Sequence, residues 1–225
     1  MGFYWAEAAK KEWNERANSW HAKSKEMWET GSRKDIVAFV KEHVPTYAKI
    51  CDLGCGDGYG SFKLAVNGFE VIGIDVSDEM IEKARSFEKP GTLDFFKGDI
   101  ASLAFPSQSF DGIIAINSLE WTESPLKVLR EMKRIIKPGG RACVGILGPT
   151  AGPRENSYRR LYGESVVCNT IMPWEFERLA SENGFQKTAE LGVFKRDTED
   201  LQKGTLSKEI IQALTFMTVF MLESL

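Results

Sequence analysis

The stretch that decides the fold is KICDLGCGDGYGSF, from Lys49 to Phe62. It overlaps the apolar run AKICDL and contains four glycines and two aspartates within the nine positions from Asp52 to Gly60. A strand that ends in a glycine-rich turn and continues into a helix usually cradles a phosphate group at the helix N-terminus. The acidic side chains of this turn raise the question of which ligand it holds.

Neither common phosphate-binding pattern fits this turn. A dinucleotide-binding loop has glycines at relative positions one, three and six, but no count from Gly54, Gly56 or Gly58 finds a glycine at the sixth position. A Walker loop would end in Gly-Lys-Ser or Gly-Lys-Thr, and this turn does not. Asp52 and Asp57 would also repel a pyrophosphate that approached the backbone amides. We therefore expect a nucleoside with a positively charged tail, and S-adenosylmethionine has sulfonium and ammonium groups.

The order of apolar runs and helical patterns predicts parallel strands joined by helices. Strands are expected at AKICDL, EVIGIDV, TLDFFKG, FDGIIAIN, RACVGIL and FQKTAELGVF. Helices are expected from about Tyr59 to Val66, from Ser77 to about Phe87, over PLKVLREMKRII and over PWEFERLASENGF. The near-continuous hydrophobicity of the strands is typical of a sheet that is covered on both faces.

Three further segments are harder to assign. We expect KPGG to end the preceding helix through a left-handed Gly139 or Gly140. Residues 148–172 look irregular and are a candidate insertion on the substrate side of the domain. The tail SKEIIQALTFMTVFMLESL is compatible with a buried helix or a buried strand. Its β-branched and aromatic residues favour a short helix to about Ala213 and a final strand from about Thr215 to Leu222.

Acidic and amide side chains follow three of these strands. Asp75 ends the second strand about 20 residues beyond the glycines, where a carboxylate can accept hydrogen bonds from both ribose hydroxyls. Asp99 follows the third strand and could accept a bond from an adenine amino group, while Ile100 packs on the ring. Asn117 comes at the carboxyl end of the fourth strand, which borders the ligand crevice of an open parallel sheet.

With these residues, the chain resembles the class I S-adenosylmethionine-dependent methyltransferases of the small-molecule group. The resemblance covers roughly Ala48 to the C-terminus and rests on ICDLGCGDGYG, VIGIDVS, FKGDI, FDGIIAINSLEW and LREMKRIIKPGG. It implies a Rossmann-like, doubly wound α/β sheet of seven strands, mostly parallel with the last strand antiparallel. It also implies in-line transfer of a methyl group from S-adenosylmethionine to a small-molecule acceptor.

The resemblance and the residues together define a candidate site. The expected cofactor-binding residues are Asp52, Gly54, Cys55, Gly56, Gly58, Asp75, Val76, Asp99, Ile100, Asn117, Trp20 and Arg33. The expected substrate pocket contains Glu120, Trp121, Tyr158 and Tyr162. Many relatives carry a histidine at the place of Trp121, and in some of them it helps to deprotonate the acceptor. No catalytic residue is assigned here, and Glu120, His21 and Tyr158 are the candidate bases.

Tryptophans recur in the N-terminal segment at intervals of eight, seven and eight residues, namely Trp5, Trp13, Trp20 and Trp28. Such spacing predicts a helical aromatic stripe. The stripe either packs on the domain or forms a lid over the cofactor and acceptor; an interfacial membrane helix is disfavoured because acidic and basic residues are mixed along it. We divide the chain into a helical cap at 1–45 and a cofactor-binding domain at 46–225, with the insertion at 148–172.

Composition limits the remaining classes of function. A net charge of -3 and a pI of about 5.6 provide no broad basic surface, so no nucleic-acid partner is expected. No apolar stretch approaches the roughly 20 residues that span a bilayer, and the first residues lack the apolar region of a secretory signal, so we expect a cytoplasmic protein. The four cysteines form no C-x-x-C pair, and no metal site is expected. We expect a monomer or homodimer. The alternatives to a methyltransferase function are a non-catalytic S-adenosylmethionine-binding regulator and, less favoured, an NAD-dependent oxidoreductase.

Overall fold

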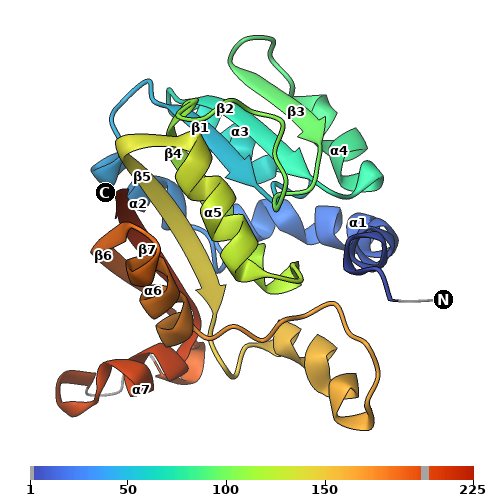
Figure 1. Cartoon of the computed structure of the whole chain (residues 1–225), viewed down its shortest axis with the longest axis vertical. Coiled ribbons are helices and arrows are strands. Elements are labelled where there is room, and N and C mark those ends of the chain that lie inside the picture. The colour runs from blue at the N-terminus through green and yellow to red at the C-terminus, as the bar shows by residue number, and fades with distance from the viewer. Residues whose placement is uncertain (1–2, 199–202) are drawn as a thin grey trace.

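A seven-stranded sheet with the order β3-β2-β1-β4-β5-β7-β6 forms the centre of the molecule (Figure 1). The computed structural model describes residues 3–198 and 203–225. The strands are β1 (Lys49–Leu53), β2 (Glu70–Asp75), β3 (Leu93–Lys97), β4 (Phe110–Ile116), β5 (Ile136–Leu147), β6 (Phe185–Phe194) and β7 (Thr215–Ser224). The pairs from β3 to β5 are parallel, and β7 is antiparallel to both of its neighbours. The expected doubly wound sheet with an antiparallel last strand is confirmed.

Helices precede and connect these strands. The α-helices are α1 (Trp5–Glu29), α2 (Ile36–His43), α3 (Tyr59–Ala65), α4 (Asp78–Ala84), α5 (Pro125–Ile135), α6 (Pro173–Glu182) and α7 (Lys208–Ala213). Short 3₁₀ helices are η1 (Arg85–Phe87), η2 (Leu119–Trp121), η3 (Gly152–Tyr162), η4 (Arg196–Thr198) and η5 (Lys203–Thr205). Within the described residues, no helix is long and apolar enough to cross a lipid bilayer.

Two apolar layers cover the two faces of the sheet. Successive residues of a strand point to opposite faces, so Ile50 and Cys51 of β1 belong to different core clusters. The Cys51 cluster contains the buried faces of α5 and α6, whereas the Ile50 cluster contains those of α2, α3 and α4. Because α2 packs into this second layer, the segment predicted as a cap (1–45) also contributes side chains to the core of the domain.

The prediction that KPGG ends α5 is wrong. The helix ends at Ile135, and Ile136 is already extended, with φ -80° and ψ 143°. Ile136 is buried and pairs with Phe110 of β4, so the chain enters the sheet directly after the last helical turn. Gly139 does take a left-handed φ of 74°, but it does so within β5 rather than at a helix cap.

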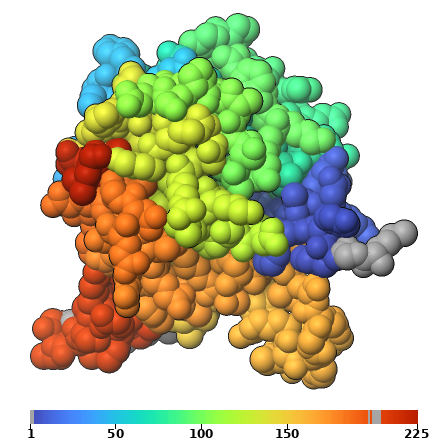
Figure 2. Space-filling model, viewed as in Figure 1, coloured from blue at the N-terminus to red at the C-terminus, as the bar shows by residue number. Residues whose placement is uncertain are grey.

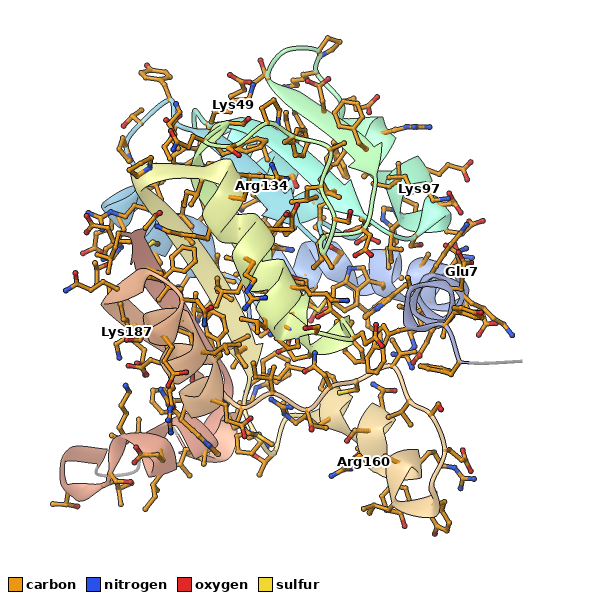
Figure 3. All side chains as sticks on the ribbon, viewed as in Figure 1. Glu7, Lys49, Lys97, Arg134, Arg160 and Lys187 are labelled. Carbon is orange, nitrogen blue, oxygen red and sulfur yellow. The ribbon has the colours of Figure 1, made fainter. Side chains whose placement is uncertain are left out.

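Residues 148–172 are not wholly irregular, because η3 occupies their centre. This helix begins at Gly152, includes Pro153 in its first turn and ends before Gly163, whose φ is 77°. Figure 2 shows that it forms a lobe projecting from the body of the molecule. Figure 3 shows the side chains of this lobe, with Arg160 labelled, apart from those near Glu7 on α1.

Candidate functional site

The glycine turn joins the carboxyl ends of three strands. Gly54, Gly56 and Gly58 have φ values of 75°, 56° and 79°, in the left-handed region that favours glycine. The N–H of Gly54 donates to the carbonyl of Ile74 in β2 at 2.8 Å. A Cβ on Gly54 would stand 2.4 Å from the Cβ of Ser118, so the turn lies directly against the segment that follows β4.

Asp75 is held in place by backbone amides of two elements. One carboxylate oxygen accepts from the N–H of Gly56 and the other from the N–H of Ser77, each at 2.9 Å. Burial raises the pKa of Asp75, and the backbone hydrogen bonds oppose that rise. Each oxygen retains a lone pair, so the carboxylate can accept two further hydrogen bonds from a ligand.

The two acidic side chains of the turn itself have protein partners. Ser61 Oγ donates to Asp52 at 2.6 Å. Asp57 is 2% exposed and contacts Ser24 Oγ at 2.7 Å and His21 Nδ1 at 2.8 Å, both on α1. The carboxyl groups of Asp52 and Asp57 are therefore engaged within the protein, whereas Asp75 borders open space.

Asp52 provides a test of stability against pH. Burial raises its pKa from 3.8 to about 6, a rise that Ser61 opposes and the charge of Asp75 increases. The folded state binds the proton more tightly than the unfolded chain, so the stability that this proton contributes is complete below pH 3.8 and is lost as the pH rises through about 6. Asp52→Asn should therefore raise the free energy of unfolding by about 2–3 kcal/mol at pH 7.5.

The gain from Asp52→Asn should vanish below pH 4, where the parent carboxyl is protonated in both states. Urea denaturation at pH 7.5 and pH 3.5 measures both values, and Asp94→Asn on the edge strand β3 is the control. Equal gains at the two pH values would contradict the assignment of a raised pKa to Asp52.

A first cavity of about 170 Å³ opens at the carboxyl ends of the strands. Its walls come from the glycine turn, the ends of β2 and β3, the segment from the end of β4 to the start of α5, and α1 between Trp5 and Trp20. The predicted residues that line it are Trp20, Gly54, Gly56, Asp75, Val76, Asp99, Ile100, Asn117 and Trp121. Ser118, which is 7% exposed, also lines it, and its Oγ has no hydrogen-bond partner in the described residues.

A second cavity of about 300 Å³ adjoins the first. Trp13, Trp20, Asn117 and Trp121 line both cavities. The second cavity extends to residues at the ends of β5 and η3 and to Arg33, which follows α1. Two adjoining chambers with shared walls can hold two reactants side by side.

α1 closes both cavities with tryptophan side chains. Trp13 makes edge-to-face contacts with Trp20 and with Trp121, at centroid distances of 5.6 Å and 5.1 Å. Trp5 Nε1 donates to the carbonyl of Trp121 at 2.7 Å. Trp28 differs, because it packs in the core against Gly60. The predicted stripe therefore divides into three residues at the cavities and one in the core.

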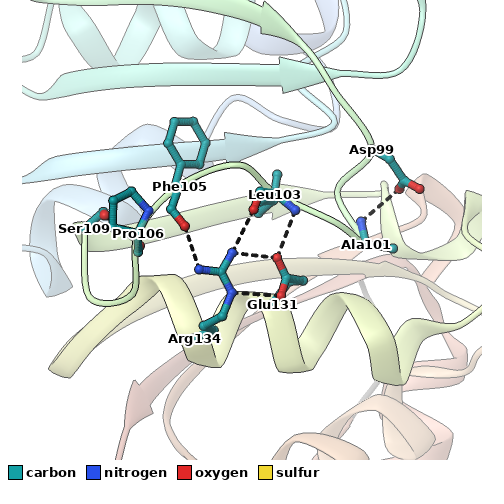
Figure 4. A network of polar contacts seen from close by, with 8 residues as sticks. All are labelled: Asp99, Ala101, Leu103, Phe105, Pro106, Ser109, Glu131 and Arg134. Carbon is teal, nitrogen blue, oxygen red and sulfur yellow. Dashed lines mark hydrogen bonds and ion pairs between the residues drawn. The ribbon is translucent and has the colours of Figure 1, made fainter.

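The loop that follows β3 is fixed to α5 (Figure 4). Arg134 donates to the carbonyls of Leu103 and Phe105 at 2.9 Å and 2.6 Å and pairs with Glu131. Glu131 in turn accepts from the N–H of Leu103 at 2.9 Å. At the start of the loop, Asp99 accepts from the N–H of Ala101 at 2.9 Å, which leaves its second oxygen at the cavity. These bonds hold the predicted adenine-side wall of the cavity in one position.

Several predicted site residues lie elsewhere. Arg33 lines the second cavity rather than the first. Asp52, Cys55 and Gly58 lie behind the first cavity within the turn, and Glu120, Tyr158 and Tyr162 line neither cavity. Tyr158 and Tyr162 are 53% and 64% exposed on the η3 lobe, where their hydroxyls contact each other at 3.3 Å.

None of the three candidate bases lines either cavity. Glu120 is fully buried, accepts from the N–H of Leu147 at 2.6 Å, and has a raised pKa because of its burial. His21 contacts Asp57, and Tyr158 lies on the lobe. Lining residues that sequence reasoning missed include Trp5, Trp13, Met80 and Phe216. The tryptophan spacing was a signal for Trp5 and Trp13, whereas no pattern indicated Phe216.

The comparisons with known proteins agree with this geometry. A family model described as "Methyltransferase domain" matches residues 51–144. The malonyl-[acyl-carrier protein] O-methyltransferase of Erwinia pyrifoliae is 33% identical over 44% of this chain and 37% of its own length. The 27-O-demethylrifamycin SV methyltransferase of Amycolatopsis mediterranei is 30% identical over 53% of this chain and 47% of its own length. The matched regions thus span about half or less of these curated relatives.

Solved structures show the same fold over most of the chain. A methyltransferase in complex with the Trm112 activator of Haloferax volcanii has a TM-score of 0.73 and 20% identity, and the match covers 96% of each chain. The PH0226 protein of Pyrococcus horikoshii has a TM-score of 0.64 and 25% identity over 85% of this chain and 89% of its own. The fold is that of the class I S-adenosylmethionine-dependent methyltransferases, and the family match over residues 51–144 supports membership of this class, whose cofactor is S-adenosylmethionine.

Proposed function

We propose that this protein transfers a methyl group from S-adenosylmethionine to a small-molecule acceptor. The observation that carries the proposal is the pair of adjoining cavities that share Trp13, Trp20, Asn117 and Trp121. One chamber has the glycine turn and Asp75 in its wall, and the other lies beyond the shared tryptophans.

The first cavity fits S-adenosylmethionine. Asp75 can accept hydrogen bonds from the ribose hydroxyls, and Asp99 and Ile100 can contact the adenine. The methionine portion would rest against Gly54 and Gly56, which line this cavity. The free Ser118 Oγ provides a hydrogen-bonding group beside it.

The remaining predicted cofactor residues act through the shape of the turn in this proposal. Gly58 is the N-cap residue before α3 and has a left-handed φ, and Asp52 ties β1 to α3 through Ser61. Cys55 is half-buried, and desolvation raises the pKa of its thiol, so it contributes packing rather than a nucleophile.

When bound, S-adenosylmethionine supplies a methyl carbon that its sulfonium has already activated. The protein then has to align the acceptor with that carbon and exclude water. Alignment of two bound reactants can lower a barrier by about 7–11 kcal/mol. Trp13, Trp20 and Trp121 provide rigid apolar walls for both tasks. We assign no general base, in keeping with the absence of His21, Glu120 and Tyr158 from the described cavity walls.

We further propose that α1 acts as a lid. Polar contacts fasten it to the domain at several points: Lys10 pairs with Asp78 at 2.7 Å, and Asn14 accepts from Ser77 Oγ at 2.7 Å. The Lys10–Asp78 ion pair is partly exposed and is therefore weak enough to open and close. Opening of this helix would uncover both cavities, because its tryptophans form their shared wall.

Trp20→Ala tests the lid. Loss of a wall that both cavities share should speed cofactor dissociation and lower acceptor turnover by about tenfold, with little change in the free energy of unfolding because Trp20 is only half-buried. Stopped-flow displacement of S-adenosylhomocysteine and turnover of an acceptor measure these effects. Trp174→Ala in α6 is the matched control. Unchanged residence and turnover in Trp20→Ala would contradict a lid at this position.

The relatives differ in the acceptors that their names give, which include malonyl-[acyl-carrier protein] and 27-O-demethylrifamycin SV. For this chain we propose a small metabolite as the acceptor, a cytoplasmic location and a monomeric or homodimeric state. The acceptor is to be found by incubating the protein with labelled S-adenosylmethionine and metabolite extract. In a thermal-shift assay, S-adenosylmethionine should stabilise the protein and NAD should not. Cofactor binding without turnover of any metabolite would contradict the proposed activity and favour a regulator.

A further inference from the structure

Positive charge collects in the second cavity without a matching carboxylate. Arg16, Lys23 and Arg33 line it, and no aspartate or glutamate does. Arg16 has an ion pair with Glu12. Lys23 and Arg33 form no ion pair within residues 3–198 and 203–225.

Arg33 is a buried cation that has only neutral contacts. It is 4% exposed, and its guanidinium donates to Met27 Sδ at 3.0 Å and to Asn117 Oδ1 at 3.1 Å. The guanidinium carbon Cζ of Arg33 lies 5.0 Å from the centre of the Trp20 ring. Burial lowers the pKa of Arg33 to about 10, a fall that the charges of Glu120 and Asp57 oppose, so the group is still charged at neutral pH. Neither of these carboxyl groups forms an ion pair with the guanidinium, so its burial is costly, and an anion in the adjoining space would reduce that cost.

The other walls of the second cavity are flat and apolar. Trp13, Trp20, Trp121 and Phe216 contribute aromatic faces. Arg16 donates to Asn156 Oδ1 at 2.8 Å and thereby links α1 to η3 at the edge of the cavity. Aromatic walls favour a ligand with a planar, apolar body. A matching ligand thus combines such a body with one negative charge.

We propose that the methyl acceptor is a small aromatic or conjugated acid, whose carboxylate pairs with Arg33 and Lys23 while its planar body packs among the tryptophans. A guanidinium can donate two parallel hydrogen bonds to a carboxylate. The exposed Lys23 of α1 adds a second positive charge to the wall of the second cavity. This inference depends on the proposed function, because it assigns the second cavity to the acceptor.

The cofactor has a carboxylate of its own, and Asn117, the partner of Arg33, lines both cavities. The experiment must therefore separate the two sources of a carboxylate. 5′-Methylthioadenosine lacks the amino-acid tail of S-adenosylhomocysteine, so a comparison of the two isolates contacts to that tail.

The test is calorimetry on the protein saturated with S-adenosylhomocysteine. The probes are matched acids and amides: cinnamate with cinnamamide, and indole-3-acetate with indole-3-acetamide. At least one acid should bind about tenfold more tightly than its amide, and Lys23→Met should reduce that preference to about threefold or less. Lys25→Met, an exposed lysine of α1 outside the cavity lining, should keep it.

A second series measures S-adenosylhomocysteine and 5′-methylthioadenosine on Arg33→Met. An acceptor site is supported if Arg33→Met changes the affinities for both nucleosides equally, or changes neither, and abolishes the preference for an acid over its amide. Selective loss of S-adenosylhomocysteine affinity would assign Arg33 to the cofactor tail and overturn the inference. Equal binding of acids and amides to the parent protein, or no binding of any acid, would overturn it as well. Should Arg33→Met fail to fold, Lys23→Met on the exposed surface decides the question. A parent protein that binds no S-adenosylhomocysteine would instead contradict the proposed function itself.

Discussion

Asp75→Ala is expected to weaken S-adenosylmethionine binding by about 2–4 kcal/mol, because two hydrogen bonds to a charged acceptor are lost and water compensates only in part. The same carboxylate accepts from the N–H groups of Gly56 and Ser77, so its removal also frees the turn that supports the methionine portion. Titration calorimetry with S-adenosylmethionine and S-adenosylhomocysteine measures the loss. Both ligands should be affected alike, since they share the ribose.

Glu79→Ala is the matched control for Asp75→Ala, because it removes an exposed carboxylate of the neighbouring helix α4. Circular dichroism and urea denaturation establish that each variant is folded. Affinity within a factor of about two of the parent value in folded Asp75→Ala would remove this residue from the cofactor site.

Gly58→Ala should lower the free energy of unfolding by about 2–5 kcal/mol. An L-residue at a φ of 79° costs about 1–2 kcal/mol. In addition, the new Cβ would stand 2.7 Å from both the Ala84 Cβ and the Phe95 ring, in a layer where crowding typically costs about 1–3 kcal/mol. Urea denaturation at neutral pH measures the sum.

Gly91→Ala separates the two contributions. Gly91 has a φ of 77°, almost that of Gly58, but a Cβ there would meet nothing within 4 Å. This variant should show only the backbone cost of about 1–2 kcal/mol. If the two variants lose the same stability, the close packing of Gly58 against α4 and β3 does not contribute as described.

Patterns that are local in the sequence predicted most of the fold. The central strands β2 and β4 contain near-continuous apolar runs. Ser77 caps α4 by accepting from the N–H of Met80, as its position before a helical pattern indicated. The failure at KPGG shows the limit of such reasoning. A glycine after a helix usually ends it, but the pairing of Ile136 with Phe110 is a contact between distant residues, and it decides where α5 stops.

The candidate site was predictable where backbone geometry alone brings residues together. Asp75, Asp99 and Asn117 follow neighbouring parallel strands, and all three line the first cavity. The position of Arg33 could not be predicted, because its partner Asn117 lies 84 residues away on another element. Tyr158 and Tyr162 mislead for a similar reason: their aromatic character indicates a pocket, but η3 turns them toward solvent.

The placement of β7 between β5 and β6 has a consequence for how the chain folds. Among the strands of residues 3–198 and 203–225, β6 pairs with β7 alone, so it cannot join the sheet before the later strand arrives. Until β7 arrives, β5 is the last strand of the sheet and has one unpaired edge, and β6 is an unpaired strand. Such exposed edges are templates for association between chains, and late, non-local pairing is slow. Aggregation during refolding should therefore arise at the β5 and β6 edges, and not at the strands β1, β2 and β3 that contribute to the cofactor site.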